Sequence, residues 1–154
     1  MTDSTMGETI LAESFNAQSG RHAILACDNN SAWLYMHEPT QDENELAPVE
    51  SSGFAFNLIP PITRAEINDF RPSPPPIVDE FASAIAVIEN PTDCTWRMQW
   101  SSDGSAVYVS RDGFEWCALT PEFQMGLSRS VELDGPWGMP WQDDVFDKIE
   151  WTTE

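Results

Sequence analysis

The stretch from Cys94 to Thr120 constrains the fold most, because two Asp-Gly pairs lie there between apolar-rich runs. Asp103-Gly104 and Asp112-Gly113 each predict a two-residue type I′ turn, since Asp and Gly tolerate the positive φ angles that this turn requires. Two such turns make residues 94–120 a three-stranded antiparallel meander. The protein is therefore predicted to be mainly β, in the α+β class.

The two turns also predict how the strands pair. Trp100 should face Val107 and Met98 should face Val109 across the first turn. Across the second turn, Val109 should face Trp116, and Ala118 should face Val107. Because side chains alternate between the faces of a strand, one face then collects only apolar residues: Trp96, Met98, Trp100, Val107, Val109, Phe114, Trp116 and Ala118.

The opposite face of this meander is mixed in character. It places Arg97 and Glu115 on either side of Ser110 in one row. Opposite charges on neighbouring strands stabilise a sheet by about 0.2–1 kcal/mol. We therefore predict a cross-strand charge pair there, with a structural role.

A second hairpin is predicted at residues 22–37, with a turn at Asn29-Asn30, because Asn accepts the left-handed conformation. Its register pairs Cys27 with Ala32 and His22 with His37. Two opposed histidines suggest a metal site, but metals in proteins normally take three or four ligands. No further ligand stands at a suitable spacing, so we predict neither a metal nor a cofactor.

The remaining N-terminal half contains shorter signals. Residues 7–18 fit either a strand or a helix, and the Ser19-Gly20 turn that follows favours a strand. Residues 39–52 are acidic and interrupted by prolines, which predicts an exposed loop before a strand at 53–59. Thr63 and Glu66 form a capping box that predicts a helix over 64–70. Residues 71–77 form a proline-rich connector, with a polyproline II ligand as the alternative.

In the C-terminal half, residues 81–89 are apolar and fit a buried strand over 84–89 or a helix. Residues 135–141 are irregular and contain Trp137 and Trp141. We expect these indoles to cover an apolar face; if exposed, they would be anchors for a partner protein. A short helix is predicted at 143–151, because Asp143 and Asp144 favour a helix N-terminus.

Length and charge limit the classes of function. The chain has 154 residues, enough for one domain spanning 1–154, and a net charge of −19 with a single lysine, Lys148. This charge argues against binding to nucleic acid or to anionic membranes, and it permits a basic protein partner. No run of about 18 apolar residues and no secretory signal is present, so a cytoplasmic location is expected.

Sequence motifs for catalysis are absent. The chain contains no phosphate-binding glycine loop, no HExxH and no GxSxG. Three cysteines without a CxxC predict buried thiols and no disulfide framework. Carboxylates are abundant, so no particular pair stands out, and an enzyme is the less favoured interpretation.

Two turn motifs carry a resemblance to a known family. Cys27-Asp28-Asn29-Asn30 precedes the strand Ala32–Tyr35, and Trp100–Gly104 is followed by Arg111-Asp112-Gly113. In this the chain resembles a family of short bacterial proteins known only as a domain of unknown function. The resemblance covers Arg21 to Thr120, and the first motif departs from the family pattern by lacking its glycine. The family implies no activity and therefore no catalytic residues.

Two functions remain as expectations. The first is a non-catalytic, acidic binding module for a basic protein, for example a toxin or nuclease that it neutralises. Its support is the net charge of −19 together with Trp137 and Trp141. The alternative is a small enzyme or ligand-binding domain, with an aromatic, carboxylate-lined cleft between the meander and the first hairpin.

Overall fold

The computed structural model describes residues 9–70, 74–121 and 123–152, and it contains two β-sheets. The first sheet has the strand order β1-β2-β3-β4 and the second has β5-β6-β7-β8-β9. Neighbouring strands are antiparallel except β8 and β9, which are parallel. The strands are β1 (Thr9–Asn16), β2 (Arg21–Cys27), β3 (Ser31–His37), β4 (Val49–Asn57), β5 (Trp96–Trp100), β6 (Val107–Arg111), β7 (Phe114–Thr120), β8 (Phe123–Ser128) and β9 (Met139–Pro140).

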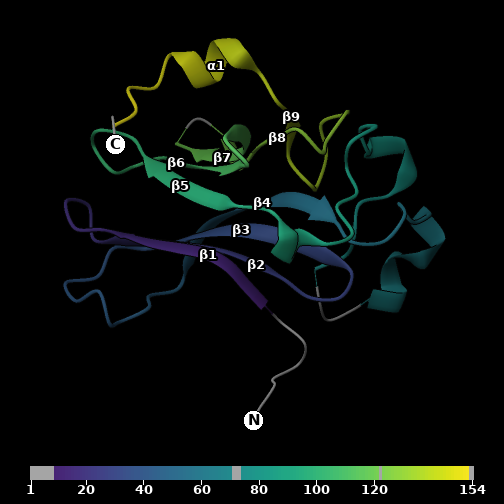
Figure 1. The fold of residues 1–154 in the computed structure, drawn as a ribbon, viewed down its shortest axis with the longest axis horizontal. Helices are drawn as coiled ribbons and strands as arrows, with labels where there is room; N and C mark the ends of the chain where they lie inside the picture. The colour runs from purple at the N-terminus through teal and green to yellow at the C-terminus, as the bar shows by residue number, and fades with distance from the viewer. Residues whose placement is uncertain (1–8, 71–73, 122, 153–154) are drawn as a thin grey trace.

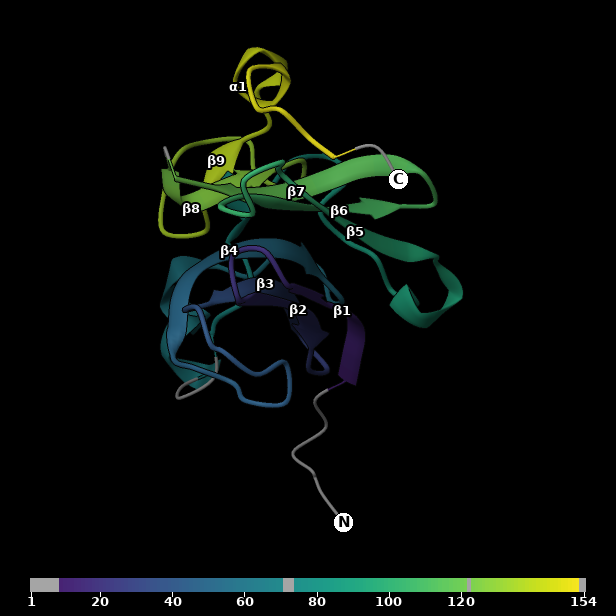
Figure 2. The same cartoon turned by 90° about the vertical axis from the view of Figure 1, so that its left-hand side faces the viewer.

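The two sheets face each other as layers, and the one α-helix among the described residues, α1 (Asp143–Asp147), lies over the outer face of the second sheet (Figures 1 and 2). The segment between β4 and β5 holds three short 3-10 helices, η1 (Arg64–Phe70), η2 (Asp79–Phe81) and η3 (Pro91–Asp93). No helix in the described part of the chain is long and apolar enough to cross a membrane. The predicted mainly β class is confirmed, and the hairpin and the meander belong to different sheets.

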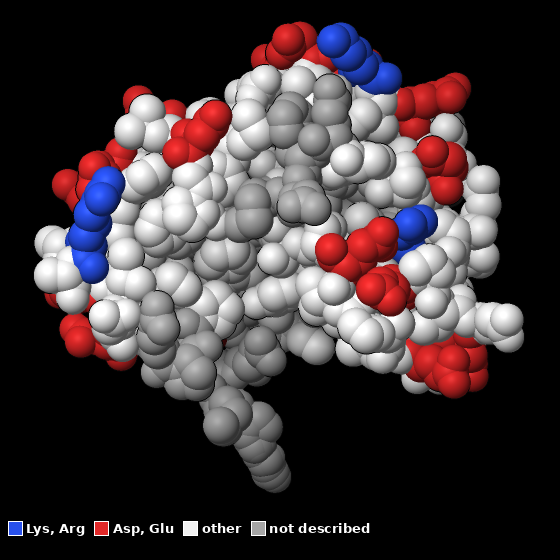
Figure 3. All heavy atoms as spheres, turned by 180° about the vertical axis from the view of Figure 1, so that it is seen from behind, with Lys and Arg blue, Asp and Glu red and all other residues white. Residues whose placement is uncertain are grey.

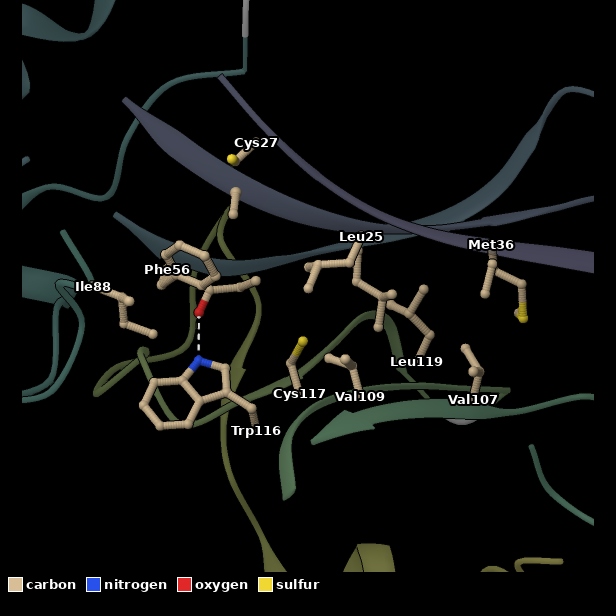
Figure 4. Close-up of a cluster of buried hydrophobic side chains, with 14 of the residues drawn as sticks. Leu25, Cys27, Met36, Phe56, Ile88, Val107, Val109, Trp116, Cys117 and Leu119 are labelled. Atoms are coloured by element: carbon tan, nitrogen blue, oxygen red, sulfur yellow. Dashed lines mark hydrogen bonds between the residues drawn. The ribbon is translucent and has the colours of Figure 1, made fainter. Parts of the chain in front are cut away.

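Two apolar clusters fill the molecule. The larger one lies between the sheets, where alternate residues of β2 and β3 meet the inner face of the meander (Figure 4). The smaller one lies against Trp33 and Phe54 of the first sheet and includes Ile77 and Val78 from the segment after β4. Both faces of the first sheet are thus buried in part, which explains the apolar character of β3 on both of its sides.

Across the first turn of the meander the predicted register is confirmed: Trp100 faces Val107 and Met98 faces Val109. The turn itself differs from the prediction, because Gly104 has a positive φ of 74° and Asp103 does not. Gly104 packs so closely on the β1–β2 turn that a Cβ there would collide with Asn16. The second turn is the predicted one, since Asp112 and Gly113 have φ angles of 51° and 87°.

The predicted register beyond the second turn is wrong. Val109 faces Cys117 and not Trp116, and Val107 faces Leu119 and not Ala118. The cause is a β-bulge, because Trp116 is an extra residue in β7 between Glu115 and Cys117.

The bulge turns two successive side chains of β7 into the same core. Trp116, Cys117 and Leu119 all join the cluster between the sheets, together with Trp100 and, partly buried, Trp96. Phe114 does not join it and remains 48% exposed. The prediction that three indoles gather beneath one ribbon is therefore confirmed, while the predicted places of Phe114 and Ala118 are wrong.

On the outer face the predicted row of Arg97, Ser110 and Glu115 is present. Among the described residues, however, no ion pair joins Arg97 to Glu115. Residues that share a row of the sheet form an ion pair only if their side chains reach each other. The distance between the Arg97 and Glu115 side chains depends on the twist of the sheet and on the bulge in β7, which strand order alone does not give.

In the hairpin at 22–37 every predicted pair is confirmed, including Cys27 with Ala32 and His22 with His37. The turn is closed by Asp28, whose Oδ1 accepts hydrogen bonds from the Asn30 and Ser31 amides at 2.7 and 2.9 Å. Neither Asn29 nor Asn30 has a positive φ, so the expected left-handed turn is wrong. The hydrogen bonds accepted by the Asp28 carboxylate stabilise the chain reversal in place of a left-handed backbone conformation.

The two histidines connect this hairpin to the acidic loop that follows it. His22 Nε2 lies 2.7 Å from the Glu43 carbonyl, and His37 Nδ1 lies 2.7 Å from the Ala47 carbonyl. The loop ends at Pro48, because β4 begins at Val49, four residues before the predicted strand start at 53.

Elsewhere several local predictions need correction. Residues 9–16 are a strand, as favoured. The helix at 64–70 forms as a 3-10 helix, and the Glu66 carboxylate accepts the Thr63 amide at 2.8 Å, which is half of a capping box. The strand predicted over 84–89 does not form. This segment makes only an isolated bridge to the end of β4, in which the Asn57 amide donates to the Ala86 carbonyl and the Ile88 amide donates to the Asn57 carbonyl. Strand β8 was not predicted.

The ends of the connector and of the C-terminal helix also differ from the predictions. Residues 71–73 of the proline-rich connector lie outside the described residues, and Ile77 is fixed by Asn57, whose Oδ1 accepts its amide at 2.9 Å. The helix predicted at 143–151 is shorter and ends at Asp147. The chain then returns to β5, where Trp151 bridges to Ser101.

Candidate functional site

The two tryptophans of the 135–141 segment have different environments. Trp137 is 4% exposed, belongs to the smaller apolar cluster, and donates its indole NH to the Pro75 carbonyl at 3.1 Å. It forms the wall of a hollow of about 200 Å³ beside Phe81 and Val78. Trp137 therefore covers an apolar face, and it does not present the exposed indole that a partner anchor requires.

Trp141 lies at the surface, half-buried, beside Arg129. The guanidinium carbon of Arg129 lies 4.4 Å from the centre of the Trp141 ring and 4.1 Å from the centre of the Phe114 ring. The planar cation is thus in contact with two aromatic rings, an arrangement that attracts each ring face to the charge. Three residues far apart in the sequence form one unit.

Several contacts hold this unit in place. Arg129 Nε donates to the Glu115 carbonyl, and the Trp141 indole NH donates to Asp143 Oδ1 at 2.9 Å. Behind Trp141 lies the ring of Phe146, at 4.9 Å between centroids. A side chain that is already ordered loses less conformational entropy on binding, so the unit is well prepared for contact with a partner.

The surroundings of Arg129 are partly dehydrated and rich in carboxylates. Burial lowers the pKa of Arg129, and the nearby charges of Asp143 and Glu115 oppose that shift. Glu132 lies in the same neighbourhood and is exposed. The guanidinium stays charged, since the pKa of arginine lies far above neutral pH.

An open hollow of about 330 Å³ adjoins Arg129 and Trp141, and its rim includes Ile85, Pro140 and Glu132. Ile85 is 49% exposed. We call this set of neighbouring residues the Arg129 surface: Ile85, Phe114, Arg129, Pro140 and Trp141. It combines Trp, Arg and exposed apolar side chains, the composition typical of protein-binding hot spots.

Sequence reasoning identified Trp141 but missed Arg129 and Phe114. Phe114 was assigned to the buried face by strand alternation, and the bulge at Trp116 removed that assignment. Arg129 follows β8, which was itself not predicted. No local signal links these residues, because their contact depends on how β7, β8 and the segment before α1 are arranged.

The acidic charge is spread over the molecule. Seen from behind, Asp and Glu side chains lie at several separate places, most of them near the edge of the view, and the few Lys and Arg side chains in view have acidic neighbours (Figure 3). Two ion pairs are present among the described residues, and both lie at or near the surface: Arg21 with Glu50, and Arg64 with Glu80. The field around the protein is therefore negative without one dominant acidic patch on this face.

The space between the hairpin and the meander does not form the aromatic cleft that the alternative function needs, because the larger cluster fills it. What remains is a hollow of about 210 Å³ at one end of the sheets, here called the end pocket. Among the residues whose side chains the structure describes, none in its lining is aromatic; the lining includes Arg21, Met36, Glu50, Ser51, Ser105, Thr120 and Pro121.

Nucleophilic or metal chemistry has little support from the geometry. Cys117 is buried between the sheets, and burial raises the pKa of its thiol, which disfavours the reactive thiolate. In the part of the chain that the structure describes, no three His, Cys, Asp or Glu side chains come together as metal ligands would.

The fold and its surface define a two-layered, mainly β protein with an acidic exterior and an aromatic–arginine surface patch. Comparison of the chain with models of protein families, with curated proteins and with solved structures found no match. The resemblance to a bacterial family of unknown function therefore stays a prediction.

Proposed function

We propose that this protein is a non-catalytic binding module for a basic protein and that the Arg129 surface is its contact region. The observation that carries the proposal is the stack of Arg129 between Phe114 and Trp141 at the rim of an open hollow. Ordered aromatic and arginine side chains supply much of the binding energy in protein interfaces. A cytoplasmic location remains an expectation.

Charge selects the class of partner. The net charge of −19 attracts cationic proteins over a distance of about one Debye length, roughly 8–10 Å at physiological salt. Near the Arg129 surface, Glu115, Glu132 and Asp143 offer carboxylates to incoming lysine or arginine side chains. A toxin or nuclease with a cationic active surface fits this description, and blocking that surface would neutralise it.

The test is affinity capture at low salt followed by measured dissociation constants. The immobilised protein is exposed to a panel of purified basic proteins, including a basic ribonuclease, and to an acidic protein of similar size. We expect capture of a basic protein with an affinity that weakens as salt rises. Binding of the acidic protein, or no capture of any cationic protein, contradicts the proposal.

Variants then locate the contact region. Phe114→Ala and Trp141→Ala should each weaken binding by at least about tenfold, corresponding to about 1.4 kcal/mol for a moderate hot spot. The matched control is Leu46→Ala, since Leu46 is 57% exposed on the loop between β3 and β4. Equal affinities for all three variants and the wild type would place the contact region elsewhere.

A further inference from the structure

The end pocket lies between the two sheets, at the end of the molecule where the β1–β2 turn, the β3–β4 loop and the β5–β6 turn gather (left in Figure 1). It is separate from the Arg129 surface, since the two share no lining residue. Its walls come from both sheets: Arg21, Met36 and Ser51 from the first, and Thr120 from the second.

Two buried hydroxyl groups belong to the lining of this pocket. Thr120 is 4% exposed, and neither its Oγ1 nor the Oγ of Ser51 has a hydrogen-bond partner among the described residues. Native proteins satisfy nearly all buried polar groups, and exceptions call for an explanation such as a bound molecule. Two such hydroxyls, one from each sheet, belong to residues that line the same hollow, where rotation of their side chains would present them to a polar occupant.

A charged pair closes another wall. Glu50 is an extra residue in β4, because Met36 faces Ser51 and His37 faces Val49. Its carboxylate binds Arg21 through two hydrogen bonds, of 2.8 and 3.2 Å. Bulges commonly redirect a side chain beside a functional site, and here the result is a fixed, electrically neutral pair with spare donor and acceptor positions.

We propose that the end pocket binds a small, uncharged, polyhydroxylated molecule, a polyol or a monosaccharide. Hydroxyls on the ligand can both donate and accept, which matches Ser51, Thr120 and the Arg21–Glu50 pair. Met36 and Pro121 offer apolar contact to the C–H groups of such a ligand.

Charge and size exclude other ligand classes. The overall charge of −19 repels anions, and the carboxylate in the described lining, Glu50, is already paired with Arg21, so no unpaired charge is left there to hold a cation. A volume of about 210 Å³ is below the roughly 300–1,000 Å³ that is usual for drug-sized ligands. The occupant is therefore no larger than one sugar ring.

The experiment is an NMR titration of the uniformly ¹⁵N-labelled full chain. The probes are glycerol and D-glucose, with acetate and methylammonium as charged probes of similar or smaller size. We expect saturable shifts of the Ser51, Ser105 and Thr120 amide signals with the hydroxylated probes only. Absence of saturable shifts with both hydroxylated probes, or equal shifts with a charged probe, overturns the proposal.

Variants test the role of the two hydroxyls. Thr120→Val and Ser51→Ala should each weaken binding by about tenfold, the effect of one lost hydrogen bond of about average strength. Ser52→Ala is the matched control, because Ser52 is the neighbour of Ser51 on β4 and points to the opposite face of the strand.

Melting temperatures distinguish a binding role from a structural one. Removing an unpaired buried hydroxyl should leave the melting temperature of Thr120→Val equal to or above that of the wild type. A lower melting temperature of both variants with unchanged ligand binding would show that the hydroxyls serve the fold alone. If Thr120→Val does not fold, Ser51→Ala decides the question by itself.

Discussion

The two sheets are joined by hydrogen bonds to one backbone carbonyl, and we expect a specific non-additive response when these bonds are removed. The Ala55 carbonyl accepts the Trp116 indole NH at 2.8 Å and the Ser130 hydroxyl at 2.6 Å (Figure 4 shows the first). Ala55 is an extra residue in β4, since Ala32 faces Phe56 and Trp33 faces Phe54. Its carbonyl is therefore available to the opposite sheet.

The perturbation is a double-mutant cycle with Trp116→Phe and Ser130→Ala. Ser130→Ala removes one hydrogen bond and leaves the Ala55 carbonyl paired with Trp116, so it should cost about 0.5–1.5 kcal/mol. Trp116→Phe also removes part of a buried ring, because Trp116 is 2% exposed, and should cost about 2–4 kcal/mol.

The double variant leaves a buried carbonyl without either donor. The unpaired acceptor adds a penalty of about 1–3 kcal/mol beyond the sum of the two single effects. The assay is urea unfolding followed by tryptophan fluorescence and circular dichroism, with the free energy of unfolding extrapolated to zero urea and the m-value checked for constancy.

The control pair is Ser130→Ala with Thr9→Val, because Thr9 lies at the start of β1 and does not contact the Ala55 carbonyl. Its effects should add within about 0.5 kcal/mol. The same additivity in Trp116→Phe with Ser130→Ala would refute the reasoning that one carbonyl depends on both donors.

Two further predictions concern titratable groups. Hydrogen bonds from Ser105 and Ser101 lower the pKa of Asp103 from 3.8 to about 2, so this carboxylate stabilises the fold above pH 3.8 and loses that effect as pH falls towards 2. The stability difference between the wild type and Asp103→Ala should therefore be largest above pH 4 and shrink below it; a pH-independent difference contradicts this. Cys117, whose pKa is raised by burial, should react with a thiol reagent only at the rate of unfolding, while the half-buried Cys94 reacts faster in the folded protein. Mass spectrometry of partly labelled protein separates the two sites, and early labelling of Cys117 would contradict its burial.

Prediction from sequence succeeded where neighbouring residues decide the structure. The hairpin at 22–37 has its register set by the length of one turn, and alternation of apolar residues agrees with it. Asp112 and Gly113 adopt positive φ angles, as their own chemistry favours. The prediction of a strand at 84–89 was wrong, because strands and irregular buried segments have the same apolar character.

The candidate sites depended on contacts that no local pattern contains. Trp141 was predicted to cover an apolar face, or to be a partner anchor if exposed, and its neighbours in the stack, Arg129 and Phe114, come from the end of β8 and the start of β7. Trp137 is buried, because its ring packs against Phe81 and its indole NH donates to the Pro75 carbonyl, and both of these residues lie more than 50 positions earlier in the chain.

Local signals in the chain were sufficient to predict the antiparallel hairpins, the positions of their turns and the three indoles that share the core. The extra residues in the strands, Glu50, Ala55 and Trp116, became apparent only from the packed sheets. A bulge interrupts its own ladder locally and redirects a side chain or carbonyl, so its position depends on the group that is met across the fold. The Ala55 carbonyl meets the Trp116 indole NH across the two sheets, and the Glu50 carboxylate meets Arg21 on the neighbouring β2.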